Sequence, residues 1–175
     1  MINAILDLSK IESSSITLDD DEIDVEAIID SVLLLVALKA QLVEIELVKI
    51  IAADLPWLTA DEVRVKQMLS NLLSNAIKFT PPGGTVRIGA ESCDDSGLKI
   101  TVSDTGIGIS GENIPLILQL FGQVGGVMTR KFEGTSLGLP LVDAMIKQHG
   151  GELQIESELG VGTAVSILFP AKRVL

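Results

Sequence analysis

The sequence predicts a two-layer α/β (α+β) sandwich: one mixed β-sheet with helices packed on one of its faces. Residues 61–79 repeat apolar residues at helical spacing. Two pairs of short alternating segments, 85–92 with 98–104 and 152–157 with 163–169, are each joined by a turn-rich stretch and predict two hairpins. Helical patterns stand between and before these pairs, so helices and strands alternate along the chain without any internal repeat.

The first third of the chain predicts short elements. Residues 1–12 have the pattern of a short helix, which is marginal in isolation and is expected to continue a longer element or to pack on a partner. Residues 16–18 are a candidate strand. Asp24 is a plausible N-cap for a helix over 25–40. Residues 43–51 alternate as a strand does.

The helix over 61–79 is the clearest element of the sequence. The dipeptides Pro81-Pro82 and Gly83-Gly84 end it, since proline cannot continue a helix. Its apolar residues follow an i, i+3, i+4, i+7, i+8, i+11 pattern and are expected to lie in the core: Val65, Met68, Leu69, Leu72, Leu73 and Ala76.

The last third of the chain predicts two helices before its hairpin. A short helix is expected around 113–121. A longer one is expected over 137–148, because Pro140 is tolerated only in a first turn and Gly150-Gly151 form a C-terminal stop.

Composition limits the possible partners. The 175 residues are enough for one domain, or one domain with an appendage, and 47% are hydrophobic. The net charge is −11 and the isoelectric point is about 4.4, which disfavours nucleic acid and anionic membrane as partners. The densest acidic run, residues 19–22, is expected to be a solvated turn.

Other bulk features indicate a cytoplasmic setting. The longest apolar run, residues 32–38, is too short to cross a bilayer, and the chain opens without the pattern of a secretion signal. Cys93 is the only cysteine, so no internal disulfide can form and a reducing compartment fits. Cys93 itself is interpreted as a small strand residue.

Four polar residues follow one side of the helix over 61–79. At about 100° per residue, Arg64, Asn71, Asn75 and Lys78 fall in a stripe about 60° wide beside the apolar face. An asparagine carbonyl can ligate Mg²⁺ without adding negative charge near a phosphate, and Lys78 can add a positive charge to one. In the alternative interpretation, the two asparagines only cap or bond neighbouring loops.

Asp104 ends an apolar strand and is followed by Thr-Gly-Ile-Gly. Its carboxylate is an acceptor that can bind the exocyclic amine of adenine, while Gly106 and Gly108 allow a flat base to approach the backbone. The alternative is an ordinary Asx turn after a strand.

A glycine-rich turn at residues 134–139 precedes the helix over 137–148. Its free backbone N–H groups and the helix N-terminus form a seat for an anion. Arg130 and Lys131 lie just upstream and are within reach of the same phosphates. Alternatively, the glycine-rich turn only begins a helix and binds no ligand. Arg130 and Lys131 are then a basic pair exposed to solvent.

Five ordered motifs resemble those of the catalytic, ATP-binding domain of sensor histidine kinases. The family belongs to the Bergerat superfamily, which it shares with gyrase-type and heat-shock-chaperone ATPases. The N box is matched by QMLSNLLSNAIKFT (67–80), the G1 box by VSDTGIGI (102–109) and the F box by LFGQ (120–123). The G2 box is matched by GTSLGL (134–139) and the G3 region by GVGT (160–163). Thr129-Arg130-Lys131 and Pro140, on either side of the G2 box, resemble kinases of the PleC type.

The resemblance implies a Bergerat ATP-binding fold over 16–175, with a mobile ATP lid at about 110–135 that Phe121 anchors. It implies ATP and Mg²⁺ as cofactors, Asn75 as the Mg²⁺ ligand, and Asp104 as the residue that binds the adenine amine, helped by Thr163 through water. The implied nucleotide-binding residues are Asn71, Asn75, Lys78, Asp104, Gly106, Gly108, Arg130, Thr135, Leu137, Gly138, Leu139 and Thr163.

The resemblance also implies partners. Residues 1–15 resemble the tail of the second dimerisation helix, but the helix that carries the phosphoacceptor histidine is not matched. His149, the only histidine, is interpreted as structural. A protein-histidine kinase fragment is therefore expected, with ATP or ADP, a phosphoacceptor helix and a response regulator as partners, and a monomeric or weakly dimeric state.

Two other functions stay open at the level of sequence. Ser136 stands where the family usually has glycine, and the segment around Gly125-Gly126 has few polar anchors. Both features favour a degenerate binding module that docks a response regulator or partner kinase without productive use of ATP. Hydrolysis of ATP is disfavoured, because the gyrase-type relatives place a glutamate at the position of Asn71 to activate water.

Overall fold

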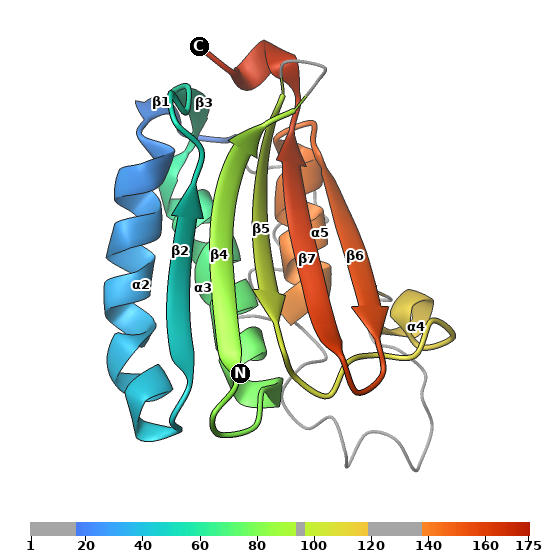
Figure 1. Ribbon diagram of the computed structural model, residues 1–175. Helices are drawn as coiled ribbons and strands as arrows, with labels where there is room; N and C mark the ends of the chain where they lie inside the picture. Colours follow the sequence, from blue (N-terminus) through green and yellow to red (C-terminus); the bar gives the residue numbers. More distant parts are fainter. Residues whose placement is uncertain (1–16, 94–96, 119–137) are drawn as a thin grey trace.

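A computed structural model describes residues 17–93, 97–118 and 138–175, and these residues form two layers (Figure 1). One layer is a five-stranded sheet in the order β2-β4-β5-β7-β6. β2 pairs with β4 in parallel, and every other neighbouring pair is antiparallel. The strands are β2 (Glu46–Ile51), β4 (Thr85–Ser92), β5 (Leu98–Asp104), β6 (Glu152–Glu158) and β7 (Gly162–Phe169).

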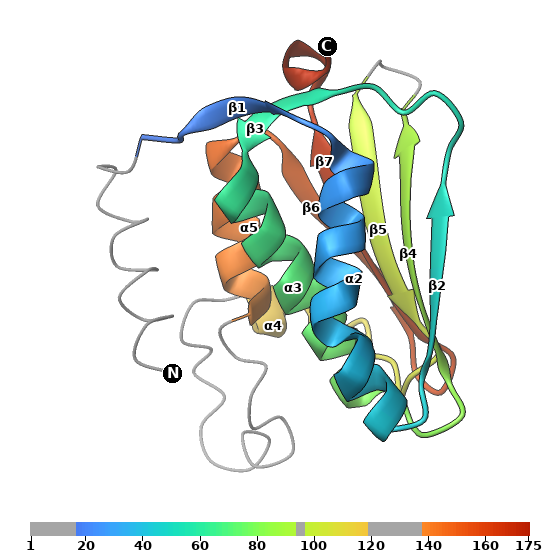
Figure 2. The same cartoon turned by 90° about the vertical axis from the view of Figure 1, so that its left-hand side faces the viewer.

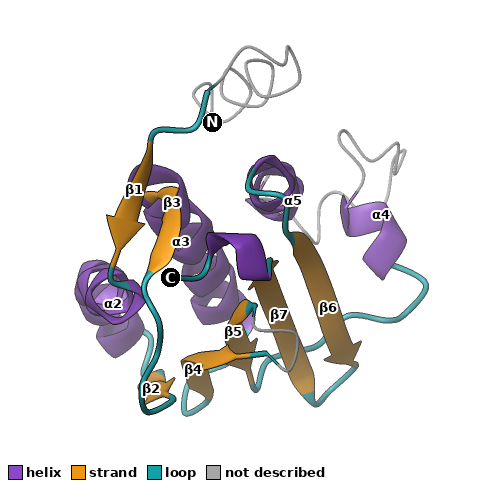
Figure 3. Cartoon of the chain, turned by 90° about the horizontal axis from the view of Figure 1, so that it is seen from above, coloured by secondary structure: helices purple, strands orange, loops and turns teal. Residues whose placement is uncertain are grey.

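The second layer consists of helices on one face of this sheet (Figures 2 and 3). α3 (Glu62–Phe79) lies between α2 (Val25–Leu42) and α5 (Gly138–Gln148), and the short α4 (Ile114–Leu118) contacts α5. The predicted class, a mixed sheet with helices on one face, is therefore confirmed. None of the described helices has both the length and the apolar composition needed to cross a membrane.

A second, two-stranded sheet corrects two expectations. β1 (Asp20–Ile23) pairs antiparallel with β3 (Leu58–Asp61), beside the 3-10 turn Ala171–Arg173. The first strand therefore does not lie at 16–18, and the acidic run 19–22 is not a turn. Backbone pairing does not require apolar side chains, so three acidic residues extend into water from β1 while only Ile23 is buried.

Acidic N-caps fix where the two long helices begin. The Asp24 carboxylate accepts the Ala27 N–H at 3.2 Å, as predicted, and the Asp61 carboxylate accepts the Arg64 N–H at 3.0 Å. Each cap satisfies a backbone donor that the first helical turn leaves free. The predicted helix over 61–79 thus begins at Glu62, with Asp61 as its cap.

The strand predicted at 43–51 begins later, at Glu46. α2 continues to Leu42, and the Val43 N–H still donates to the Ala40 carbonyl at 3.2 Å. Glu44 then adopts φ 57°, a left-handed conformation that breaks the extended pattern. The alternation of apolar residues alone did not reveal this turn.

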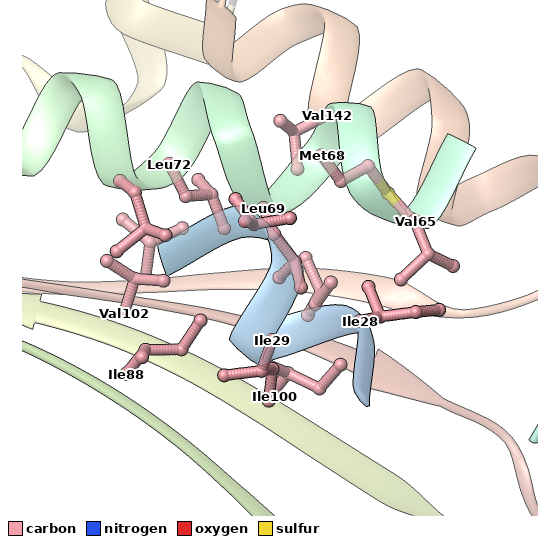
Figure 4. Close-up of a cluster of buried hydrophobic side chains, with 14 of the residues drawn as sticks. Ile28, Ile29, Val65, Met68, Leu69, Leu72, Ile88, Ile100, Val102 and Val142 are labelled. Carbon is pink, nitrogen blue, oxygen red and sulfur yellow. The ribbon is translucent and has the colours of Figure 1, made fainter. Parts of the chain in front are cut away.

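The core lies between α2, α3, α5 and the sheet (Figure 4). All six residues predicted for the buried face of α3 are buried, together with Ile77. They pack against strand residues that alternate toward the helices, including Ile88, Ile100 and Val102. The hairpin strands β4 and β5 have the predicted bounds, because period-two alternation and turn residues agree there.

His149 is fully buried at the end of α5 and joins three elements. Its Nδ1 lies 2.8 Å from the Met145 carbonyl oxygen, and its Nε2 accepts the Asp61 N–H at 3.2 Å. Its ring meets the edge of Phe169, with centroids 5.6 Å apart. These contacts fit one neutral tautomer, with the proton on Nδ1, and agree with a structural role.

We expect His149 to make folding stability depend on pH. Burial lowers the pKa of His149 below its ordinary value of 6.5, so the fold favours the neutral ring and stability falls as pH drops below that value toward the lowered pKa. His149→Ala should lower the free energy of unfolding by about 2–4 kcal/mol at neutral pH. Urea titrations between about pH 7.5 and 5.5 should show a smaller loss of stability for the variant than for the wild type. Parallel pH curves for the two proteins would contradict this assignment.

Candidate functional site

A pocket opens between the C-terminal half of α3 and the ends of β5 and β7. It encloses about 620 Å³, the open space at its mouth included. α4, α5 and the segment that follows β5 complete its walls. The lining residues are Leu72, Asn75, Ala76, Phe79, Val102, Asp104, Ile107, Gly108, Ile109, Ile117, Leu139, Thr163 and Val165.

Asp104 is the only carboxylate among the described residues that line the pocket. Its Oδ1 accepts the Gly106 N–H at 2.8 Å, the geometry of an Asx turn, and the Thr163 N–H also bonds to it. Burial raises the pKa of this carboxyl above its ordinary value of 3.8, although the two N–H groups act in the opposite direction. The Asx turn is therefore compatible with a binding role, because a carboxylate can accept several hydrogen bonds.

Asn75 reaches the same pocket from α3. Its amide nitrogen is buried and has no hydrogen-bond partner among the described residues. A Cβ added at Gly138 would lie 3.1 Å from this nitrogen. A buried amide without a partner needs an acceptor from elsewhere, which points to a ligand in the pocket.

The segment after β5 is held close to its neighbours by glycine. Gly108 has φ +68°, and a Cβ at this position would overlap the Glu158 carbonyl at the end of β6. A Cβ on Gly106 would likewise overlap the Phe79 carbonyl. These glycines thus bring the segment against protein backbone, and Gly108 alone of the two lines the pocket.

Gly108→Ala should therefore destabilise the fold. The left-handed φ and the overlap with Glu158 together predict a loss of at least about 1 kcal/mol in the free energy of unfolding, measurable by chemical denaturation. Gly111→Ala is the matched control, because nothing lies within 4 Å of an added Cβ there, and its effect should stay within about 0.5 kcal/mol. Equal losses of unfolding free energy for the two variants would show that position 108 accepts a side chain without strain.

Ser157 supports the pocket wall although it does not line the pocket, and no sequence pattern singled it out. Its hydroxyl accepts the Ile109 N–H at 2.8 Å and donates to the Gly162 carbonyl at 2.9 Å. It also lies 2.8 Å from the Thr163 hydroxyl. One side chain thus joins the segment after β5 to the start of β7 and fixes Thr163 in the wall.

The structure brings together some of the predicted residues and not others. Asn75, Asp104, Gly108, Leu139 and Thr163 line the pocket, and Gly138 lies against Asn75.

Four predicted residues of the described part of the chain are not among those lining the pocket: Asn71, Lys78, Gly106 and Gly138. Lys78 is exposed, with its ammonium 5.3 Å from the centroid of the Phe79 ring. Arg64, on the same predicted stripe, bonds to Gln67 at 3.1 Å, away from the pocket. Arg130, Thr135 and Leu137 lie outside the described residues, as do Phe121, Ser136 and most of the predicted lid.

The sequence analysis did not identify most of the apolar residues that line the pocket as site residues. Leu72 and Ala76 carried the signal of core positions, and they serve both the core and the pocket floor. Ile117 on α4 carried no signal, because only the fold brings it to the pocket. An apolar cavity with two convergent polar groups is the usual form of a small-molecule site.

The side chains available as ligands limit which metal ion this site could hold. No group of three histidine, cysteine or acidic residues that could hold a metal occurs in the described parts of the chain. Asn75 can offer one amide oxygen after its amide turns by half a rotation, which fits Mg²⁺ only if a nucleotide and water supply the remaining ligands.

Known proteins have sequences similar to this chain. The family described as "Histidine kinase-, DNA gyrase B-, and HSP90-like ATPase" matches residues 60–173. The chain is 39% identical over 170 residues to the histidine protein kinase DivJ of Caulobacter vibrioides, covering 97% of this chain and 28% of DivJ. It is 36% identical over 179 residues to the sensor protein GacS of Pseudomonas syringae pv. syringae, covering 99% of this chain and 20% of GacS. The chain thus spans less than a third of the length of these relatives.

Solved structures of histidine kinases have a similar fold. Full-length ShkA in complex with AMPPNP superposes with a TM-score of 0.86 at 29% identity, covering 97% of this chain and 35% of ShkA. The nucleotide-free catalytic domain of the histidine kinase ThkA gives a TM-score of 0.76 at 26% identity, covering 87% of this chain and 96% of that domain. With the family match over most of its length, this chain belongs to the histidine kinase-, DNA gyrase B- and HSP90-like ATPases.

Proposed function

We propose that this chain is the ATP-binding catalytic part of a sensor histidine kinase. One observation carries the proposal: a carboxylate, Asp104, and a buried amide without a partner, Asn75, face one apolar pocket. This arrangement suits a ligand with a flat base at one end and charged oxygens at the other. The histidine kinase relatives and the AMPPNP complex of ShkA support this choice of ligand.

Asp104 would recognise the base. Its carboxylate already accepts the Gly106 and Thr163 N–H groups, and the remaining acceptor sites are available for the exocyclic amine of adenine. Thr163 would assist through water. Apolar walls from Ile107 and Leu139 would cover the faces of the base and exclude water from the hydrogen bond.

The polyphosphate would extend toward the start of α5. Asn75 would ligate Mg²⁺, which when bound neutralises charge on the phosphates. Asn71, Lys78, Gly138 and Leu139 would surround the phosphates, with Arg130, Thr135 and Leu137 from the segment before α5. Catalysis would then consist of positioning and charge stabilisation, without a covalent step on this domain.

The phosphoryl acceptor would be a histidine on a separate helix. His149, the only histidine of this sequence, is fully buried and uses both ring nitrogens in hydrogen bonds. It therefore cannot accept a phosphoryl group in this fold. We place the tail of the second dimerisation helix at 1–15, the catalytic domain at 16–175, and a response regulator downstream in a cytoplasmic signalling pathway.

The test mixes this chain with a separately produced dimerisation domain that carries its histidine, and adds radiolabelled Mg-ATP. Acid-labile label should appear on that histidine, and Asp104→Asn should prevent it. A protein that binds nucleotide with normal affinity but transfers no label would contradict the kinase function and support the degenerate docking module. A protein that binds no nucleotide would contradict the site itself.

A further inference from the structure

The outer face of α2 is apolar, although nothing in the described part of the chain covers it. Leu34, Leu35, Leu38 and Leu42 are 79%, 75%, 67% and 75% exposed. α2 is the outermost helix of its layer, beside the edge strand β2 (Figures 1 and 2). The buried side of α2 carries a separate set of apolar residues, Val25, Ile28, Ile29, Val32, Val36 and Ala40.

These exposed leucines form a second helical stripe. At about 100° per residue they fall within an arc of about 100°, the width of the apolar face of an amphipathic helix. Ala27 and Ser31 continue the stripe toward the N-terminus of α2. We call these six residues the α2 stripe: Ala27, Ser31, Leu34, Leu35, Leu38 and Leu42. A stripe of this shape is typical of a helix that packs against another helix.

The stripe is complementary to itself when reversed. Its spacing is symmetric about the midpoint between Leu34 and Leu35: reversal places Ala27 opposite Leu42 and Ser31 opposite Leu38. Small residues would thus face large ones across an antiparallel pair, as well-packed helical interfaces require. In a parallel pair, large residues would meet large ones and small residues would meet small ones.

The charges of α2 favour the same orientation. Both acidic residues, Glu26 and Asp30, lie in its first two turns, and its one basic residue, Lys39, lies near its end. An antiparallel pair places the acidic half of each helix beside the basic half of the other, whereas a parallel pair would align acidic halves. Lys49 bonds to both Glu26 and Asp30, at 2.9 and 2.7 Å. These three side chains together keep a net negative charge, so this half of α2 remains the acidic one.

We propose that a second copy of this chain covers the α2 stripe, through an antiparallel, two-fold symmetric contact between the α2 helices. The stripe has six residues, against the roughly 20–30 per partner of a standard stable interface, and each copy carries a net charge of −11. The dimer is therefore weak and strengthens when salt screens the repulsion between the copies.

Sedimentation of the 175-residue chain from low micromolar to millimolar concentrations tests the contact. We expect a monomer–dimer equilibrium whose dissociation constant falls as salt is raised. Leu34 lies next to the two-fold axis, so Leu34→Asp places two like charges together and should weaken the dimer by at least about tenfold. Val63→Asp is the matched control on α3, where Val63 is 72% exposed, and it should leave the equilibrium unchanged. Circular dichroism would verify that both variants fold.

Disulfide cross-linking in a Cys93→Ser background tests the orientation. A mixture of Ala27→Cys and Leu42→Cys proteins should cross-link, whereas Leu42→Cys alone should not, because the antiparallel pair separates the two copies of that position by about 22 Å along the helix axis. A chain that stays monomeric at millimolar concentration, or equal cross-linking by Leu42→Cys alone, overturns the proposal. The stripe would then be assigned to a different partner.

Discussion

Asp104→Asn should reduce the affinity for ATP and ADP about 10–100-fold, the loss expected for a hydrogen bond to a charged group in a buried site. Asparagine has a single acceptor oxygen, and the Gly106 N–H already bonds to the carboxylate from 2.8 Å. The amide nitrogen of the variant would then face the amine of adenine, so that two donors oppose each other. Displacement of a fluorescent ATP analogue measures the loss. Glu112→Gln, which neutralises an exposed carboxylate outside the pocket, should leave the affinity unchanged.

The same substitution should stabilise the nucleotide-free protein at neutral pH. Burial raises the pKa of Asp104, so its contribution to stability is fully present below its unfolded pKa, near 3.8, and is lost as pH rises through the raised pKa. At pH 7 the buried charge therefore lowers the free energy of unfolding, and asparagine removes that charge. Urea denaturation should show the variant to be the more stable protein at pH 7, with the difference shrinking toward acidic pH. A variant less stable than the wild type at pH 7 would mean that the ionised Asp104 carboxylate stabilises the fold.

Asn75→Ala should remove the magnesium-dependent part of nucleotide binding. In saturating Mg²⁺ the affinity for ADP should fall about 10–100-fold, and the ratio of affinities with and without Mg²⁺ should approach one. The amide nitrogen of Asn75 has no partner among the described residues, so removing this nitrogen breaks no hydrogen bond with them. The melting temperature of the nucleotide-free protein should therefore change little.

The control for this prediction lies on the same helix. Gln67→Ala, two turns earlier and outside the pocket, removes a polar side chain that bonds to Arg64. It should leave both the affinity and its dependence on Mg²⁺ unchanged. If Asn75→Ala instead weakens binding equally with and without Mg²⁺, Asn75 contacts the nucleotide directly and is not the metal ligand.

The sequence predicted well where periodicity and end signals agreed. The buried face of α3 follows one unbroken helical period and ends at prolines, and its six predicted core residues are all buried. The hairpin of β4 and β5 combines alternation with turn residues, and its strand bounds matched. β1 and β3 were not predicted, because each has only four residues and their pairing joins segments about forty positions apart.

The site was predictable to the extent that motifs carry polar groups. Asp104 and Asn75 stood out because each lies in one of several ordered motifs, Asp104 before a glycine-rich turn and Asn75 on the polar stripe of a core helix. The helical period alone grouped Asn71 and Lys78 with Asn75, yet only Asn75 lines the pocket. The walls formed by Ile117 and the support by Ser157 depend on tertiary contacts that spacing does not encode. The leucines of α2 illustrate the converse, since their apolar character predicts burial and the fold leaves them exposed.

The most direct test of the central claim, that the pocket between α3 and the sheet binds Mg-ATP, is isothermal titration calorimetry of the chain with a non-hydrolysable ATP analogue, with and without Mg²⁺. The pocket predicts saturable binding at one site, tighter with Mg²⁺, competed by ADP and weakened about 10–100-fold by Asp104→Asn. The absence of saturable heat at millimolar analogue in the presence of Mg²⁺, or unchanged binding by the Asp104→Asn protein, would contradict it.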